Sequence, residues 1–452
     1  MARASETYVC QSCGAVYSKW MGRCEACGQW NTIEVEADSA PPSAGKAGGR
    51  GGSKALRLDS LDGEITDETR YPTGNGEFDR AVGGGLVPGS ALLVGGDPGV
   101  GKSTLLLQVA AGLAQSGVRT AYISGEEAPA QIRMRAKRLG LAGAPVGLAA
   151  GTSLRDVVTT LKAEKPQAVI IDSIQTMWSD AVPAAPGTVT QVRTCAQELV
   201  RYAKNARCTL VLVGHVTKDG QLAGPRVVEH LVDATLYFES EAGRSFRILR
   251  AVKNRFGAAH EIGVFDMTGA GLREVTNPSE LFLTETDQDV SGSAVFAGIE
   301  GTRPVLCEIQ ALVSLSTLGA PRRAVVGWDS ARLSQLLAVL DARCGLDFGR
   351  HDVFLNVAGG MKITEPAADL AAAAALVSSL MEAPLPPKTV VFGEVGLSGA
   401  VRPVPQMDAR RSEAEKLGFR ALMGPKTVEG GGLDAHGFDA LVDAVAWMKR
   451  AG

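Results

Sequence analysis

The stretch GDPGVGKS, from Gly96 to Ser103, decides the fold class of this 452-residue chain. It follows the apolar run SALLVG that starts at Ser90, and a helix-like pattern begins directly after it in the sequence. In this G-x4-G-K-S pattern the glycines let backbone N–H groups wrap a phosphate, the lysine meets the β and γ phosphates, and the serine hydroxyl binds Mg²⁺. The sequence therefore predicts an ATP site with Mg²⁺. The predicted nucleotide-binding residues are Gly96, Asp97, Pro98, Gly99, Val100, Gly101, Lys102, Ser103 and Thr104.

Strand-like and helix-like segments alternate on both sides of this loop. The apolar run AVIID ends at Asp172, where a carboxylate at the carboxyl end of a parallel strand faces the same phosphates through magnesium. Ser103 and Asp172 are therefore the predicted magnesium residues. The alternation predicts an α/β P-loop core with a mostly parallel sheet, and the closely spaced runs after residue 233 predict an antiparallel extension at its edge.

Two adjacent glutamates close the strand-like segment TAYISG. Hydrolysis needs a carboxylate that orients and deprotonates water, and we choose Glu126 over Glu127 for this role. The alternative is a carboxylate pair at a helix N-terminus, which the helix dipole favours without any catalytic role.

Four cysteines near the N-terminus form two C-x2-C pairs. Each pair directs two sulfurs at one point, so four thiolates close a tetrahedral, structural zinc site. A module of about 30 residues also needs such a staple, because it cannot build an adequate core. The predicted Zn²⁺ ligands are Cys10, Cys13, Cys24 and Cys27, whereas Cys195, Cys208, Cys307 and Cys344 are scattered and are expected to pack as small apolar residues.

These patterns divide the chain into four parts. We expect the zinc module at residues 1–33, a Gly-, Ala-, Ser- and Pro-rich flexible linker at 34–57, the ATPase domain at 58–280 and a second α/β domain at 281–452. The apolar run from Leu370 to Met381 is too short for a membrane span and is expected to be a buried helix. No signal peptide is evident, so a cytoplasmic location without membrane association is expected.

The net charge of −3 offers no general attraction to nucleic acid, so any DNA binding must come from local basic patches. One candidate places five cations within twelve residues of the chain. A solvated sheet edge is the alternative interpretation. These cations are Arg244, Arg247, Arg250, Lys253 and Arg255.

The four-cysteine module, the P-loop, YISGEE from Tyr122 and KNRFG from Lys253 together resemble the bacterial RadA (Sms) family of DNA repair proteins. The resemblance covers nearly the whole chain. It implies a RecA-like ATPase core, a homo-oligomeric hexameric ring around single-stranded and branched DNA, the recombinase RecA as a partner, and ATP-driven branch migration in homologous recombination.

The resemblance also implies roles for single residues. Lys253 and Arg255 would couple hydrolysis to movement by reaching a neighbouring subunit's γ phosphate, which adds them to Lys102 and Glu126 as catalytic residues. His215 would sense the γ phosphate, with a core histidine as the alternative. The polar loop KDGQLAGPR would contact DNA, with an ordinary loop as the alternative. The residues predicted for DNA binding or coupling are Lys218, Arg226, Lys253, Asn254, Arg255, Phe256 and Gly257.

The C-terminal domain resembles the proteolytic domain of Lon proteases, most clearly in the segment from Gly393 to Phe419. An ATP-dependent serine protease is therefore a competing hypothesis. However, Ala367 and Asp408 stand where the Lon nucleophilic serine and its lysine base would be, so we expect no peptidase activity unless Ser378 or Ser379 serves as nucleophile.

The expected domain is then a platform for ring assembly and DNA binding. Five arginines are candidates for a basic surface there: Arg322, Arg323, Arg402, Arg410 and Arg411. A third hypothesis is an ATP-gated DNA-binding scaffold without motor activity.

Overall fold

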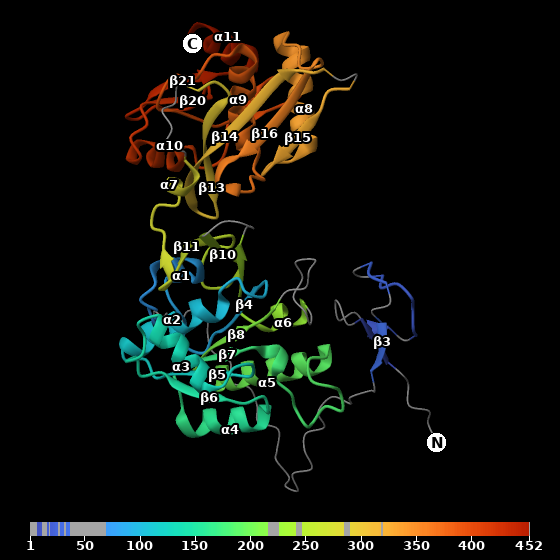
Figure 1. Cartoon of the computed structure of the whole chain (residues 1–452), viewed down its shortest axis with the longest axis vertical. Helices are drawn as coiled ribbons and strands as arrows, with labels where there is room; N and C mark the ends of the chain where they lie inside the picture. The colour runs from blue at the N-terminus through green and yellow to red at the C-terminus, as the bar shows by residue number, and fades with distance from the viewer. Residues whose placement is uncertain are drawn as a thin grey trace, which may run out of the picture. The chain divides into compact units, whose positions relative to one another are not determined.

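The structure is a computed structural model, and it describes residues 7–10, 16–17, 19–25, 28–30, 33–36, 69–215, 226–240, 246–283, 290–317 and 320–451. The chain divides into two compact units, Met1–Val275 and Thr276–Gly452 (Figure 1). Both units combine helices with mixed sheets, which confirms the predicted α/β class.

The N-terminal module is a small antiparallel sheet in the order β2-β1-β3. Its strands are β1 (Thr7–Cys10), β2 (Val16–Tyr17) and β3 (Ile33–Glu36). Cys10 and Cys24 are fully buried and form one small core with Ile33. Among the described residues of the module this core contains few apolar side chains, which is consistent with the metal site that the cysteine spacing predicts.

The ATPase core is built on a nine-stranded sheet in the order β12-β11-β10-β9-β4-β8-β7-β5-β6. Strands β9, β4, β8, β7, β5 and β6 run parallel to one another. Strands β10, β11 and β12 extend the sheet beyond β9 by antiparallel pairing, as the sequence predicted. The strands are β4 (Ala91–Gly96), β5 (Thr120–Ser124), β6 (Gly147–Ala150), β7 (Ala168–Asp172), β8 (Thr209–Val213), β9 (Ala234–Ser240), β10 (Phe246–Asn254), β11 (Ile262–Thr268) and β12 (Gly271–Glu274).

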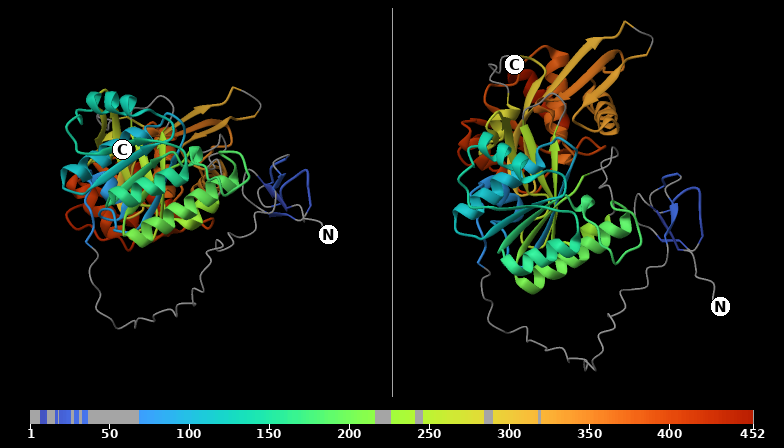
Figure 2. Two further views of the ribbon diagram at one scale, coloured as in Figure 1. Left: turned by 90° about the horizontal axis from the view of Figure 1, so that it is seen from below. Right: turned by 60° about the horizontal axis from the view of Figure 1, so that its bottom comes forward.

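Helices cover both faces of this sheet (Figure 2). Along β4, Leu92 and Val94 pack into one core with α1, α2 and α3, while Ala91 and Leu93 pack into the other with α4, α5 and α6. A strand buried on both faces reads as a continuous apolar run, which is why ALLVGG is so clear in the sequence. The helices are α1 (Gly76–Val82), α2 (Lys102–Gln115), α3 (Pro129–Arg138), α4 (Leu154–Glu164), α5 (Val189–Ala206) and α6 (Arg226–Leu231).

The second unit is built on a seven-stranded sheet in the order β15-β16-β14-β13-β17-β20-β21. Its strands are β13 (Ser293–Glu300), β14 (Arg303–Leu315), β15 (Arg323–Val326), β16 (His351–Val357), β17 (Thr389–Val391), β20 (Ala421–Pro425) and β21 (Asp434–Phe438), with a separate hairpin of β18 (Glu394–Val395) and β19 (Val401–Arg402). The helices are α7 (Ser279–Phe282), α8 (Ser330–Cys344), α9 (Asp369–Met381), α10 (Met407–Lys416) and α11 (Leu441–Ala451).

Helix α9 is buried along most of its length and packs against β13 and β14, which confirms the predicted buried helix. Strand β17 lies directly before a change of sheet. The chain leaves the large sheet at Gly393, whose backbone exchanges hydrogen bonds with Ala367 and Leu370, so residues 394–395 pair in the small hairpin instead.

No helix in the described ranges is both long enough and apolar enough to cross a membrane.

Candidate functional site

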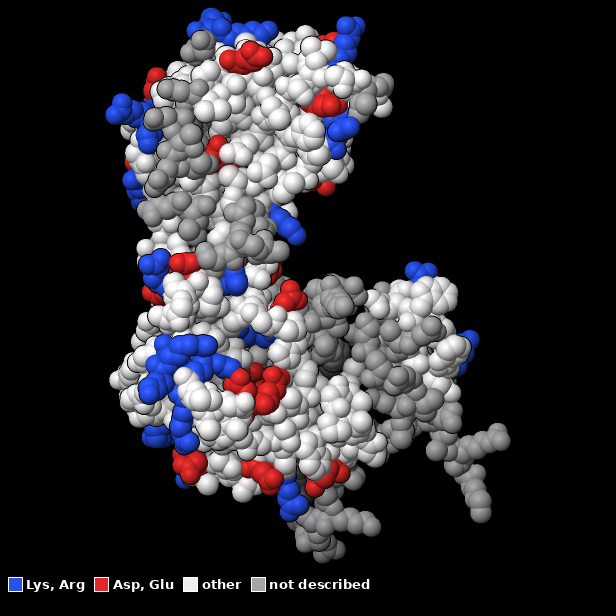
Figure 3. Space-filling view, in the orientation of Figure 1, with Lys and Arg blue, Asp and Glu red and all other residues white. Residues whose placement is uncertain are grey.

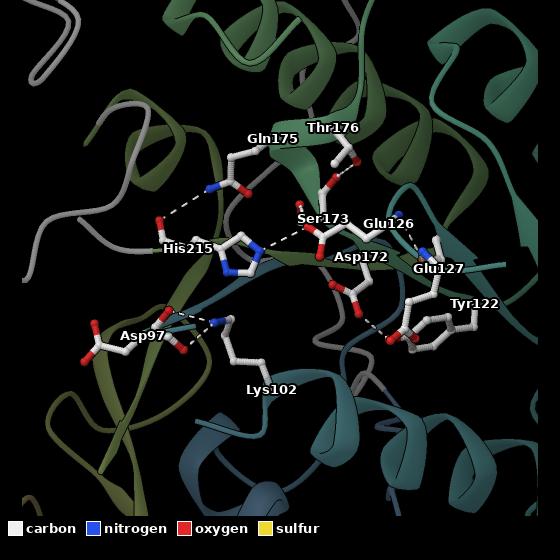
Figure 4. Close-up of polar contacts among 12 residues, drawn as sticks. Asp97, Lys102, Tyr122, Glu126, Glu127, Asp172, Ser173, Gln175, Thr176 and His215 are labelled. Atoms are coloured by element: carbon white, nitrogen blue, oxygen red, sulfur yellow. Dashed lines mark hydrogen bonds and ion pairs between the residues drawn. The ribbon is translucent and has the colours of Figure 1, made fainter. Parts of the chain in front are cut away.

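The carboxyl ends of the parallel strands β4, β5, β7 and β8 meet at one edge of the nine-stranded sheet. In a parallel sheet this edge is where ligands bind, because the chain there turns into loops and helix N-termini. The strands deliver Lys102, Glu126, Asp172 and His215 to this edge, and Figure 4 shows their side chains facing one another.

The P-loop connects β4 to α2. Gly99 and Gly101 have φ angles of +81° and +113°, which favour glycine, and a Cβ on Gly101 would lie 2.7 Å from the Cε atom of Met267. Helix α2 starts at Lys102, so its free N–H groups point to the loop where phosphate binds.

The Lys102 ammonium is buried inside this loop. Its Nζ atom donates hydrogen bonds to the carbonyl oxygens of Gly96 (2.7 Å) and Asp97 (2.9 Å). Burial lowers the pKa of Lys102, and the charges of Asp172, Asp97 and Glu126 oppose this shift. These carboxylates therefore help to keep the lysine in the cationic form that phosphate binding requires.

Asp172 has the environment of a magnesium ligand. Its carboxylate is 5% exposed, and Oδ2 accepts a 2.5 Å hydrogen bond from the Tyr122 hydroxyl. The other oxygen, Oδ1, is buried and has no hydrogen-bond partner among the described atoms. A buried carboxylate oxygen normally has a hydrogen-bond partner. The lack of one at Oδ1 fits a ligand to a hard cation that the Ser103 hydroxyl also binds.

Glu126 is held by two neighbouring side chains. Its Oε1 atom accepts a 2.6 Å hydrogen bond from the Ser173 hydroxyl and lies 3.1 Å from Nε2 of His215. Burial acts to raise the pKa of Glu126, but the hydrogen bonds from Ser173 and His215 and the charges of His215 and Lys102 outweigh it and hold the pKa below its usual value. This carboxylate is therefore ionised and oriented, as a base that activates water must be.

Glu127 has a different environment. Its carboxylate forms an ion pair with Arg135 of α3, and its backbone N–H donates to the Ser124 hydroxyl. This geometry supports the choice of Glu126 over Glu127.

His215 lies directly behind β8 and is brought to the site. Its ring contacts Glu126, and its carbonyl oxygen accepts a 3.4 Å hydrogen bond from the Gln175 amide. At 30% side-chain exposure it is not an enclosed core histidine, so the geometry favours the nucleotide-sensing interpretation.

The KNRFG segment lies at the opposite end of the parallel strands. Arg255 binds Asp233 through its guanidinium (3.2 Å), and the same carboxylate accepts a hydrogen bond from the backbone of Ala91, the first residue of β4. The P-loop follows the last residue of β4. The structure therefore does not bring Lys253 and Arg255 to the nucleotide site of their own chain.

Strand pairing places KNRFG beside the start of β4. Asn254 pairs with Ala234, and Ala234 pairs with Leu92, the second residue of β4. The P-loop begins at Gly96, further along β4 by about 13 Å at a rise of about 3.3 Å per residue.

The KNRFG residues make specific contacts where they lie. Lys253 donates hydrogen bonds to the carbonyl oxygens of Glu229 (2.8 Å) and Val232 (2.7 Å) at the end of α6. Asn254 Oδ1 accepts from the Phe256 backbone N–H, and a Cβ on Gly257 would lie 2.8 Å from the Cα atom of Gly83. The segment thus joins β10, α6 and the end of α1 by close contacts.

Other predicted DNA contacts are only partly described. Arg226 is the first residue of α6, but its side chain lies outside the described residues, as do Lys218 and Arg244. Arg247 donates to the carbonyl oxygen of Val100 in the P-loop (3.3 Å), and Arg250 pairs with Glu239 (3.6 Å). The predicted basic strip is therefore engaged with its own domain at these two positions.

Two of the four predicted zinc ligands lie among the described residues. Cys10 and Cys24 are buried in the same core, and the Tyr17 hydroxyl lies 3.2 Å from the Cys24 sulfur. Cys13 and Cys27 lie outside the described residues. The two described thiols fit half of a four-sulfur zinc site.

The four other cysteines follow the expectation in part. Cys195, Cys208 and Cys307 are fully buried, and burial raises the pKa of both Cys195 and Cys208 to about 12. Cys344 is half-buried.

In the C-terminal unit, the two positions compared with Lon differ in environment. Ala367 is buried, whereas Asp408 lies on the surface and pairs with Arg411. Ser378 donates to the Ala383 carbonyl oxygen (2.6 Å), and Ser379 accepts from the Val313 backbone N–H (2.9 Å), so both hydroxyls serve the fold. These contacts support the expectation that the domain is proteolytically inactive.

Arg410 is a correction to the predicted basic surface, because it is 1% exposed and lies in the core. It forms a two-bond ion pair with Glu365, at 2.6 and 3.2 Å, and donates to the carbonyl oxygens of Ala297 and Pro405. A fully buried guanidinium needs all these partners, which only the folded domain brings together.

Sequence reasoning missed two features near the site. Helix α3 carries Arg133, Arg135, Lys137 and Arg138, and Lys and Arg side chains gather over this part of the first unit in Figure 3. The four cations within six residues were a visible signal. Tyr122 was noted only as part of a strand and of the YISGEE motif, without a role of its own.

The chain is similar to known proteins along most of its length. The chain matches family models described as AAA domain (residues 77–221), Rubredoxin metal binding domain (8–34) and Subunit ChlI of Mg-chelatase (309–428). It is 59% identical to the DNA repair protein RadA of Brucella abortus over 427 residues, which are 93% of this chain and 91% of that protein. The chain belongs to the RadA family.

Two further relatives agree. The chain is 50% identical to the DNA repair protein RadA of Pseudomonas aeruginosa over 425 residues, and 50% identical to that of Salmonella typhimurium over 433 residues, with 94% of each chain covered. The predicted resemblance to RadA is thus confirmed. The family models place an AAA-type ATPase domain on the P-loop and a metal-binding ribbon on the N-terminal cysteines.

Proposed function

We propose that this RadA-family protein is a DNA-dependent ATPase motor that moves along single strands and drives branch migration of recombination intermediates. The observation that carries the proposal is the convergence of Lys102, Asp172 and Glu126 at one sheet edge. His215 contacts Glu126 and directly precedes the segment that contains Lys218 and Arg226, the predicted DNA contacts. One side-chain contact thus separates the proposed base from the start of the proposed DNA loop.

The P-loop holds the nucleotide in this proposal. Its backbone N–H groups and the N-terminus of α2 bind the phosphates, and the Lys102 ammonium leaves its carbonyl partners for the β and γ phosphates. Ser103 and Asp172 would hold magnesium, which would supply positive charge to neutralise the phosphates.

Glu126 activates water. Its Oε1 atom is occupied by Ser173 and His215, so Oε2 is the oxygen that accepts a proton from the attacking water. A γ phosphate bound near His215 competes with Glu126 for contact with the His215 imidazole. This competition connects the state of the nucleotide to the segment that follows β8 in the sequence.

The finer parts of the proposal rest on the family resemblance. The subunits form a homo-oligomeric ring, taken as a hexamer, around single-stranded or branched DNA, and the recombinase RecA is the partner. Because Lys253 and Arg255 lie far from the nucleotide site of their own chain, we assign them to the nucleotide site of a neighbouring subunit, where they couple hydrolysis to movement. Zn²⁺ bound by Cys10, Cys13, Cys24 and Cys27 holds the N-terminal module together.

The test uses the purified full chain with ATP and Mg²⁺ on a labelled three-strand DNA junction, beside the Lys102→Ala variant. Branch movement and phosphate release are recorded together. We expect both from the wild type and neither from the variant. Phosphate release without strand movement, with RecA absent and present, would contradict the motor and favour an ATP-gated DNA-binding scaffold.

A further inference from the structure

Tyr122 occupies the middle of β5, between the P-loop helix and the strand that ends in Asp172. Its side chain is 1% exposed. The hydroxyl of a buried tyrosine normally forms a hydrogen bond with a polar group, and it can fix the orientation of that group. Here the partner is the Asp172 carboxylate, at 2.5 Å.

The hydrogen bond distinguishes the two oxygens of Asp172. Tyr122 donates to Oδ2, whereas Oδ1 is buried without a partner among the described atoms. Rotation of the carboxylate about its last bond would exchange the two oxygens. The tyrosine hydroxyl fixes this rotation, so the same oxygen always faces away from Tyr122.

We propose that Tyr122 is a positioning residue of the nucleotide site, which orients Asp172 so that Oδ1 is presented to the magnesium ion bound with ATP. The inference rests on the proposed ATPase site and adds to it a residue that touches neither nucleotide nor metal. Partners that orient metal ligands commonly set metal affinity, and their loss weakens it by about 10- to 100-fold.

The variant Tyr122→Phe removes the hydroxyl and keeps the ring that fills the core. A matched control exists in Tyr202, whose hydroxyl donates a 2.7 Å hydrogen bond to the carbonyl oxygen of Leu161, between α5 and α4. Tyr202→Phe also removes one tyrosine hydroxyl from the same domain, but at a place without a predicted metal ligand.

The first measurement is the affinity of the full-length protein with bound ADP for Mn²⁺, followed by electron paramagnetic resonance of free Mn²⁺. We expect Tyr122→Phe to weaken Mn²⁺ binding by about tenfold or more and Tyr202→Phe to leave it unchanged. Binding of a fluorescent ADP in EDTA should be the same in all three proteins. Equal Mn²⁺ affinity in Tyr122→Phe and the wild type, or equal losses in both variants, would overturn the proposal.

The second measurement is the Mg²⁺ dependence of ATP hydrolysis. Tyr122→Phe should need more Mg²⁺ for half-maximal rate and recover most of its kcat at saturating Mg²⁺, whereas general damage to the fold would lower kcat at every Mg²⁺ concentration. A wild type that shows no metal-dependent nucleotide binding would refute the proposed ATPase site itself, which is a different result from failure of the tyrosine.

Discussion

The Nζ atom of Lys253 lies 2.7 Å from the carbonyl oxygen of Val232, and this contact closes the end of α6. With the bond to the Glu229 carbonyl, it places a cation where the helix dipole is negative, which stabilises a helix end by about 1 kcal/mol. Lys253→Ala should therefore loosen α6, retain nucleotide binding and move DNA poorly. Hydrogen exchange of α6 amides and the three-strand assay measure the two effects.

Lys204→Ala is the control for this variant. Lys204 lies 3.6 Å from Asp233 and is half-exposed, so its removal takes a cation from the same cluster without freeing the carbonyl groups of α6. Equal exchange rates and equal strand movement in Lys253→Ala and Lys204→Ala would contradict the role given to Lys253.

The adjacent glutamates should separate cleanly by mutation. Glu126→Gln should lower kcat for ATP hydrolysis by about 100-fold or more, because a neutral amide cannot accept the proton of water, while ATP binding persists. Glu127→Gln should retain most of the rate, since Glu127 pairs with Arg135 outside the reacting groups. Steady-state phosphate release and fluorescent nucleotide binding check both. A larger loss in Glu127→Gln would reverse the assignment.

Removal of the Ser173 hydroxyl should change the pH dependence of hydrolysis. The base is active when ionised, that is, above its pKa. Burial raises the pKa of Glu126, and the bonds from Ser173 and His215 with the Lys102 charge more than offset it. Ser173→Ala should therefore raise this pKa, and the acid limb of the kcat profile should move to higher pH with little change on the alkaline side. A shift to lower pH, or an unmoved acid limb, would contradict Glu126 as the base.

The N-terminal module should hold about one zinc ion per chain. Cys24→Ser should lose the metal and unfold the module, because Cys24 is both a predicted ligand and one of the few core residues. Cys344→Ser, which alters a half-buried thiol in the C-terminal unit, should keep its zinc. Elemental analysis of carefully prepared protein decides the matter, and zinc well below one per chain in the wild type would refute the predicted site.

The buried Arg410 should be important for stability. Arg410→Met leaves Glu365 without its partner and should lower the unfolding free energy of the C-terminal domain by about 3 kcal/mol. Adding Glu365→Gln should restore part of the loss, because the uncompensated charge is gone. Thermal unfolding of both variants measures this difference, and an unchanged midpoint in Arg410→Met would contradict it.

The nucleotide site was largely predictable because local patterns carry it. A G-x4-G-K-S loop between strand and helix predicts the roles of Lys102 and Ser103. The buried run AVIID ends at Asp172, and Glu126 comes shortly after the end of β5 at Ser124. Their convergence follows from parallel strand order alone.

Features that depend on pairing across the fold were not predictable in this way. Arg410 and Glu365 are 45 residues apart, so nothing local indicates that a guanidinium is buried, and it was assigned to the surface. Tyr122 fits an apolar strand as well as any aromatic residue does, and only packing reveals its contact with Asp172. Likewise, the register of β10 sends KNRFG to the far end of the sheet, which sequence order does not encode.

That placement of KNRFG restricts how copies of the chain can meet. The P-loop and Arg255 lie at opposite ends of the same parallel strands, so a subunit that offers Arg255 to a neighbour's nucleotide must receive the next Arg255 at its other end. A two-fold pair meets this requirement only if its two chains lie antiparallel, so that each Arg255 faces the partner's P-loop, and such a pair is complete at two subunits. Head-to-tail contact meets it in larger assemblies, and its rotation per subunit determines whether the assembly closes into a ring or continues as an open helix.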